Sequence, residues 1–158
     1  MSNHLVVLDR DGLINRKLGA REYVSSPAQV EYLPGVKEGM ARLAQAGFSF
    51  VVATVQMGIA LQKVTRAQVD AVNQWIADDL AREGVRVLGW FVCPHTDEDG
   101  CACRKPKPVL LLEAARALQF APEECWNAGD SPRDVLMGIN AGCPRNILVQ
   151  SGYTPRPE

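Results

Sequence analysis

Short, continuous apolar runs alternate with amphipathic stretches along this chain. Five runs have the length and composition of buried β-strands, and they cover residues 4–8, 48–54, 85–92, 126–128 and 146–149. Between them, apolar residues recur at helical spacing, which predicts helices over 36–46, 65–82, 108–119 and 131–142. Because the strands are apolar on both faces, helices should cover both sides of the sheet. The pattern therefore predicts an α/β fold with a doubly wound, mainly parallel sheet.

Local signals mark the ends of two of these helices. Thr65 and Gln68 form a capping box before the second helix, and Gly84 follows its end. Ser131 and Pro132 provide an N-cap and a helix-opening proline for the last helix.

The length of the chain is that of one domain. Its 158 residues can bury a full core, and no linker or repeat interrupts the elements, so residues 1–158 are expected to form a single domain. The segments that follow the first two strands are too short for a large cap domain over the sheet. The proline-containing stretch 154–157 is expected to fray.

Composition narrows the classes of function. The chain has 17 basic and 18 acidic residues, a formal net charge of −1, and no basic stripe or acidic tail. This balance argues against binding to nucleic acid or to a membrane surface. No apolar stretch could span a bilayer, and the first apolar run is too short for a signal peptide. We therefore expect a cytoplasmic monomer whose partner is a small molecule.

Chemically active side chains follow several of the predicted strands. Asp9 and Asp11 follow the first strand, Thr54 ends the second, Lys105 lies in the loop after the third, and Asp130 follows the fourth. In a doubly wound sheet the site lies beyond these carboxyl ends. Each residue alone has a structural explanation as a turn acid, a β-branched strand residue or a surface lysine.

Together, these side chains and their neighbours suit phosphoryl transfer. Arg104 adds a second cation beside Lys105, and Asp134 lies one turn into the last helix, where an acid also supports the helix dipole. Acids that can attack or bind a divalent cation, with cations that neutralise phosphoryl oxygens, are the groups that this reaction uses.

A cysteine-rich loop, residues 93–103, precedes these two cations. Cys93, His95, Cys101 and Cys103 make a set of three thiols and one imidazole that suits a tetrahedral zinc ion, with no position left for water. A disulfide between two cysteines only two residues apart is sterically awkward. Such a zinc would be structural and would hold the loop that leads into the two cations. The other two cysteines, at positions 125 and 143, are expected to be buried packing residues.

The motifs resemble those of a known superfamily. The segments 8–12, 104–106 and 129–134, together with Thr54, resemble the four motifs of the haloacid dehalogenase (HAD) superfamily. Within it, the chain is similar to the small phosphatases that act on heptose bisphosphate or histidinol phosphate. The cysteine loop and the segments 23–24 and 33–36 are the more specific marks of this group.

This resemblance implies the reaction and its acids. Asp9 would be the nucleophile that forms an aspartyl-phosphate, and Asp11 would protonate the leaving sugar oxygen and then activate water. Mg²⁺ would bind Asp9, the backbone carbonyl of Asp11 and Asp130, with Asp134 in support.

The resemblance also implies the substrate contacts. Thr54 and Lys105 would hold the phosphoryl oxygens, and Arg104 would contact a phosphorylated sugar. The expected substrate is D-glycero-D-manno-heptose 1,7-bisphosphate, which would lose its 7-phosphate, and the alternative is histidinol phosphate.

The chain departs from the group's pattern after Thr54. The group has Asn, Ser, Arg and Gly at four positions where this chain has other residues, namely Val55, Met57, Leu61 and Gln62. Lys17 stands where an acid is usual, and Val109 replaces a glycine. These changes leave open whether specificity is shifted or activity reduced. A third hypothesis is therefore a phosphosugar-binding protein with weak turnover.

Overall fold

Five parallel strands form the centre of the protein. The computed structural model describes residues 4–151, so the expected fraying of 154–157 lies outside the described residues. The sheet has the order β3-β2-β1-β4-β5 and is parallel throughout; its strands are β1 (His4–Leu8), β2 (Phe48–Val55), β3 (Val87–Cys93), β4 (Cys125–Gly129) and β5 (Arg145–Leu148). Register pairs Leu8 with Val52 on one side and with Ala128 on the other.

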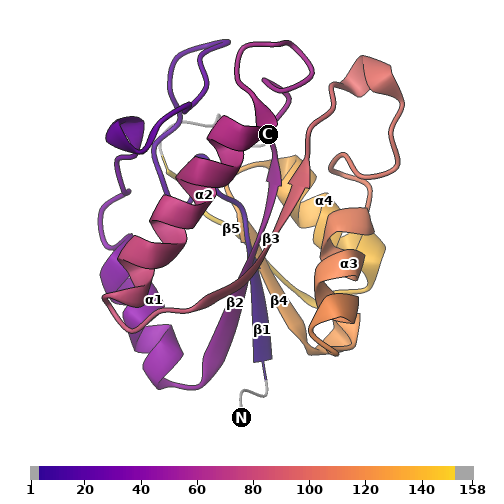
Figure 1. Ribbon diagram of the computed structural model, residues 1–158. Helices are drawn as coiled ribbons and strands as arrows, with labels where there is room; N and C mark the ends of the chain where they lie inside the picture. Colours follow the sequence, from indigo (N-terminus) through magenta and orange to yellow (C-terminus); the bar gives the residue numbers. More distant parts are fainter. Residues whose placement is uncertain (1–3, 152–158) are drawn as a thin grey trace.

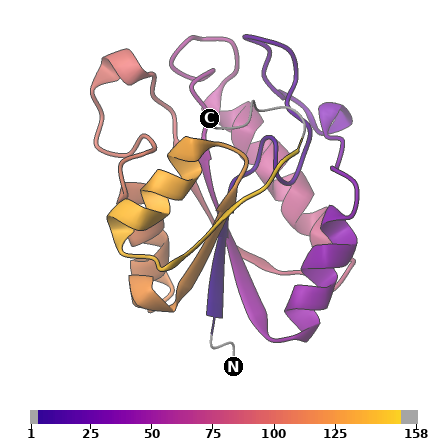
Figure 2. The ribbon, with the colours of Figure 1, turned by 180° about the vertical axis from the view of Figure 1, so that it is seen from behind.

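Helices cover both faces of this sheet, as Figures 1 and 2 show from opposite sides. One face carries α1 (Val36–Gln45) and α2 (Arg66–Ala81), and the other carries α3 (Val109–Ala117) and α4 (Pro132–Ala141). Short 3-10 turns lie in the loops, at η1 (Pro27–Gln29), η2 (Asp97–Asp99) and η3 (Pro122–Glu124). The predicted doubly wound α/β fold is confirmed. Among residues 4–151, no helix is both long enough and apolar enough to cross a bilayer.

The apolar strands are buried on both faces. Along β1, Val7 packs in the cluster that includes Met137 of α4, whereas Val6 packs in the cluster that includes Ile76 of α2. These four side chains are at most 7% exposed. This two-sided burial is the reason why the strand sequences are continuous apolar runs.

Element boundaries differ from the predictions by one to two residues. The first strand matches, and the capping box holds: the amide of Gln68 donates to the Thr65 hydroxyl, and the amide of Thr65 donates to the Gln68 side chain. The third helix ends at Ala117 rather than near residue 119, because Gln119 adopts a positive φ of 62° that no helix can continue.

The strand order locates the site. The chain builds outward from β1 through β2 to β3 and then returns to β4, which lies on the other side of β1. In open parallel sheets, ligands bind beyond the carboxyl ends of the strands where the order reverses. That switch point lies between β1 and β4, so the residues after Leu8 and after Gly129 face each other across it.

Candidate active site and zinc-binding loop

Asp9 is the central acid of the switch point. Its carboxylate accepts a hydrogen bond of 3.0 Å from the ammonium of Lys105, which also donates 2.7 Å bonds to Asp134 and to the carbonyl of Ala53. Burial alone would lower the pKa of Lys105, but Asp9 and Asp134 raise it above its usual value. Lys105 is therefore a permanent buried cation whose three N–H donors are all engaged.

Three acids converge beside this lysine. Ligand oxygens of Asp9, Asp130 and Asp134 lie within 4.8 Å of one another. Burial raises the pKa of Asp9 to about 8, the neighbouring acids add to the rise, and Lys105 offsets it only in part. Three carboxylates with two lysines, Lys105 and Lys17, still leave an excess of negative charge, which a hard divalent cation with oxygen ligands would neutralise. The donor set therefore fits Mg²⁺.

Asp134 has a structural and an electrostatic role at once. One of its oxygens accepts bonds from the amide and hydroxyl of Ser131, at 3.1 and 3.0 Å, which caps α4. Its other oxygen accepts the bond from Lys105. The structural alternative, support of the helix end, is thus seen in the structure, whereas support of a metal ion by Asp134 stays a prediction.

Gly12 allows the acids to approach. It has a φ of +90°, and a Cβ at this position would collide with the carboxylate of Asp130. A glycine directly after the paired acids is thus required both by backbone conformation and by space.

The carboxylate of Asp11 is not part of the acid cluster, although it lines the same cavity. Its oxygens accept hydrogen bonds from the side chains of Arg10, Asn15 and Gln56, and the cluster of possible metal ligands contains Asp134 instead. The Asp11 carboxylate thus lies outside the group of possible side-chain ligands, and it is expected to act in proton transfer, while its backbone carbonyl is expected to bind the metal. Both roles remain predictions.

A cavity of about 410 Å³ opens over these groups. Asp9, Asp11, Lys105 and Asp130 line it, as does Arg104. Further cations at its wall that the sequence had not singled out as site residues are Lys17, Arg21 and Arg133. A pocket with acids at one point and cations around it suits a phosphorylated ligand held next to a metal.

Thr54 is a buried residue near the end of β2. It is 1% exposed and does not line the cavity. Its hydroxyl accepts a 2.9 Å hydrogen bond from the side-chain amide of Gln56. Arg104 lines the cavity but is held by Asp97, at 2.7 Å, and by the carbonyl of His95. The predicted contacts of Thr54 and Arg104 with substrate remain proposals.

Lys17 joins the acid cluster from the loop after β1. Its ammonium lies 2.9 Å from an oxygen of Asp130. Partial burial opposes charge on this lysine, but Asp130, with Asp9 and Asp134, raises its pKa. The sequence showed only that a lysine replaces an acid here; its contact depends on how the loop folds back over β4.

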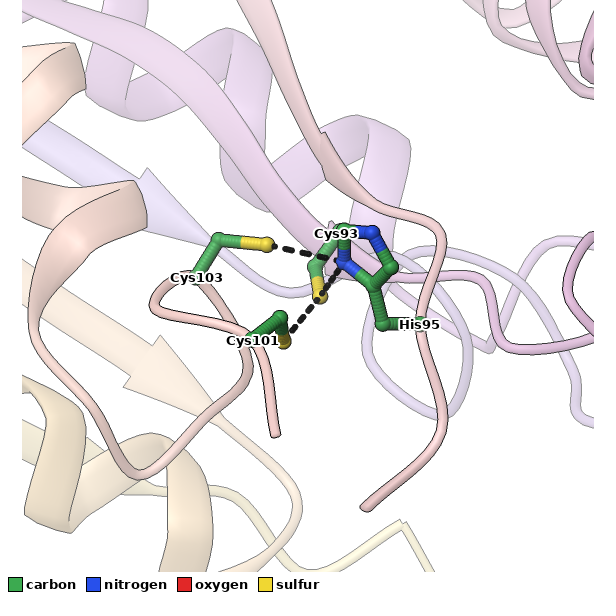
Figure 3. A group of neighbouring side chains, drawn as sticks. All are labelled: Cys93, His95, Cys101 and Cys103. Atoms are coloured by element: carbon green, nitrogen blue, oxygen red, sulfur yellow. Dashed lines mark hydrogen bonds between the residues drawn. The ribbon is translucent and has the colours of Figure 1, made fainter. Parts of the chain in front are cut away.

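The four predicted zinc ligands come together at the end of β3 (Figure 3). The sulfurs of Cys93 and Cys101 are 3.8 Å apart, and Nδ1 of His95 lies 3.6 Å from the sulfur of Cys93 and 3.3 Å from that of Cys103. Ligands at zinc bond lengths of about 2.0–2.3 Å in a tetrahedron are roughly 3.5–3.8 Å apart. The cysteines are free thiols, and the set fits a structural zinc ion.

The remaining cysteines pack as expected. Cys125 and Cys143 are buried, at 0% and 3% exposure, in the cluster under α3 and α4.

The sequence resembles known proteins over most of its length. Residues 102–158 match the model of a family described as HAD-hydrolase-like. The chain is 35% identical to a D-glycero-beta-D-manno-heptose-1,7-bisphosphate 7-phosphatase of Helicobacter pylori over 149 residues, which cover 94% of this chain and 84% of the relative. It is 39% identical to the protein of that name from Bordetella bronchiseptica, over 94% of this chain and 81% of the relative.

A solved structure has the same fold. The crystal structure of D,D-heptose 1,7-bisphosphate phosphatase from B. bronchiseptica, complexed with magnesium and phosphate, superposes with a TM-score of 0.86 at 39% identity. The match covers 95% of this chain and 81% of that one.

Proposed function

This chain belongs to the HAD-like phosphatase family that includes the D-glycero-beta-D-manno-heptose-1,7-bisphosphate 7-phosphatases, and from that premise we propose that it is a Mg²⁺-dependent phosphatase that removes the 7-phosphate of D-glycero-D-manno-heptose 1,7-bisphosphate. The observation that carries the proposal is the convergence of Asp9, Asp130 and Asp134 around a buried Lys105 at the switch point of the sheet.

Asp9 and Asp130 would bind Mg²⁺ through their carboxylates and Asp11 through its carbonyl, with Asp134 in support. The bound ion would draw negative charge from the nucleophile and from the phosphoryl oxygens, so that two anions can approach. Lys105 supplies a fixed positive charge 3.0 Å from Asp9 and favours its ionised form.

In the first step, an oxygen of Asp9 attacks phosphorus and the bond from phosphorus to the sugar oxygen breaks. Protonated Asp11 gives its proton to the departing oxygen, which leaves as the sugar hydroxyl. The product on the protein is an aspartyl-phosphate at Asp9.

In the second step, the Asp11 carboxylate takes a proton from water as the water oxygen attacks phosphorus. Inorganic phosphate leaves, the Asp9 carboxylate is restored, and Asp11 is again protonated. One acid thus serves both half-reactions and ends in the state in which it began.

The test is a comparison of esters with purified protein and Mg²⁺. We expect phosphate release from the heptose bisphosphate with a higher kcat/KM than from histidinol phosphate, and ³¹P NMR should show that the 1-phosphate is retained. A higher kcat/KM for histidinol phosphate would contradict the proposed substrate assignment. Tight binding of the heptose bisphosphate without phosphate release would contradict the activity and identify a binding protein instead.

A further inference from the structure

The carboxylate of Asp11 is enclosed by side chains that touch it from three directions. Oδ1 accepts bonds from Nε and Nη2 of Arg10, at 3.2 and 3.1 Å, and from the amide of Asn15 at 2.9 Å. Oδ2 accepts a 2.8 Å bond from the amide of Gln56 and a longer contact of 3.3 Å from Nη2 of Arg10. Asp11 is therefore held in one orientation, although its side chain is 25% exposed.

The donors are themselves immobilised. Arg10 and Asn15 are 0% exposed, and Gln56 is 3% exposed. Gln56 also donates to the Thr54 hydroxyl, and its backbone amide continues the pairing of β2 with β3 through the carbonyl of Cys93. Side chains fixed in this way can hold a partner to a fraction of an ångström.

Arg10 is a buried cation whose position depends on α2. Its Nη1 donates a 2.7 Å bond to the Oδ1 of Asn73, which is 3% exposed and 63 residues away in the chain. A buried guanidinium is costly unless its donors are paired. Asn73 and Asp11 supply that pairing from opposite sides, so a shift of Asn73 would be passed through Arg10 to Asp11.

We propose that Arg10, Gln56 and Asn73 are positioning residues for the proton transfer at Asp11. Asn73 holds Arg10 in place. Arg10 and Gln56 in turn fix the orientation of the Asp11 carboxylate, which has to pass its proton to the leaving sugar oxygen. Each carboxylate oxygen has about two lone-pair sites. Oδ1 accepts from three donor atoms, whereas Oδ2 has one short bond from Gln56 and one long contact of 3.3 Å from Arg10, so the transferred proton is assigned to Oδ2 as the less occupied oxygen.

This inference rests on the proposed function, since it takes Asp11 as the acid that protonates the leaving oxygen. A leaving-group comparison separates positioning from a general structural effect. A sugar oxygen leaves poorly without a proton, whereas p-nitrophenolate leaves without one. Misplacing Asp11 should therefore lower kcat/KM for the sugar phosphate and spare p-nitrophenyl phosphate.

The decisive variant is Asn73→Ala, because Asn73 does not line the cavity. We expect kcat/KM for the heptose bisphosphate to fall about tenfold, a part of the 10²–10⁴ that general acid catalysis supplies, and that for p-nitrophenyl phosphate to stay within about twofold. Gln56→Leu should also lower the ratio of kcat/KM for the heptose bisphosphate to kcat/KM for p-nitrophenyl phosphate. Asp11→Asn, which removes the acid itself, should lower this ratio most.

The matched control is Asp79→Asn, which alters a polar side chain on the same helix that pairs with Lys37 and not with Arg10. Its ratio of the two kcat/KM values should equal that of the wild type. An equal loss on both esters in Asn73→Ala, or an unchanged ratio, would overturn the positioning role while leaving the phosphatase proposal intact. A wild type that hydrolyses neither ester would overturn both.

Discussion

At the scale of single residues, Lys17 contacts Asp130, one of the acids that we propose as ligands of Mg²⁺. Its ammonium lies 2.9 Å from the Oδ2 of Asp130, in a cluster that also contains Asp9 and Asp134. A metal ion that binds Asp130 therefore competes with this lysine for the same negative charge. An internal cation of this kind weakens metal binding by the free energy of the contact that has to be exchanged.

We predict that Lys17→Met binds Mg²⁺ more tightly than the wild type, by about three- to tenfold, in calorimetric titrations without substrate. Arg21→Met is the control, because it removes the same charge from the cavity wall, and Arg21 forms no ion pair with an acid among residues 4–151. Equal effects of the two variants would mean that net charge, and not exchange at Asp130, sets the affinity. Weaker binding by Lys17→Met would contradict the competition.

A second residue-scale prediction concerns the pair of Asp79 and Lys37, whose charged atoms are 2.7 Å apart. Lys37, together with Tyr32, lowers the pKa of Asp79 below its usual value. Because the folded-state pKa is the lower one, the stabilisation is present above the unfolded-state pKa and is lost as the pH falls through the folded one. Asp79→Asn should therefore lower Tm at pH 7 by a few degrees, from a loss of roughly 1 kcal/mol or less.

The difference in Tm between Asp79→Asn and the wild type should shrink as the pH falls below the usual pKa of an aspartate, about 4, and should vanish once the pH is below the lowered pKa of Asp79, where its carboxyl is protonated. Thermal melts of both proteins between pH 7 and pH 3 test whether the difference in Tm shrinks as the pH falls. A difference in Tm that grows as the pH falls would contradict it.

The acids of the site could be predicted from the sequence, but their hydrogen-bond partners could not. Asp9, Asp11, Asp130 and Lys105 could be predicted because they follow strands whose ends must meet. The environment of Asp11 could not, since it depends on a contact between Arg10 and a helix residue 63 positions later. No local pattern encodes a pairing at that separation.

At the scale of elements, the zinc-binding loop connects β3 to the two cations of the site. Its ligands flank η2, and Arg104 and Lys105 follow the last ligand directly. Asp97 of η2 accepts bonds from Arg104 and from Arg133 at the start of α4, so the loop also contacts the other side of the cavity. A metal that orders the loop thereby orders two cations.

We expect elemental analysis to find about one zinc per chain and Cys103→Ser to lose it. That variant should melt several degrees lower and turn over more slowly, because the loop that carries Lys105 is no longer held. Cys125→Ala is the control for loss of a thiol, since Cys125 lies outside the ligand set. Zinc-free wild-type protein with unchanged Tm would refute a structural metal.

The elements were predicted more accurately than their ends. All five strands and four helices were found in the right order, because apolar periodicity reports which faces are buried. The 3-10 turns in the loops were not predicted, since each is a single turn that depends on local hydrogen bonds. The burial of Thr54 could not be predicted either, because the last residues of β2 look alike in sequence whether or not they reach the cavity.

At the scale of the molecule, one topological feature accounts for the site. Reversal of strand order between β1 and β4 places the nucleophile candidate Asp9 beside Asp130, although 121 positions separate them. Lys105 from the loop after β3 completes the charge balance from a third direction. The fold thus assembles from distant segments a group that no single segment contains.

The central claim is that Asp9 is the nucleophile of a magnesium-dependent phosphatase, and Asp9→Asn tests it most directly. Phosphate release from the heptose bisphosphate should depend on Mg²⁺ in the wild type and fall roughly 10⁴-fold or more in the variant, with circular dichroism showing that the variant is folded. A folded Asp9→Asn protein that releases phosphate at the wild-type rate would contradict the account.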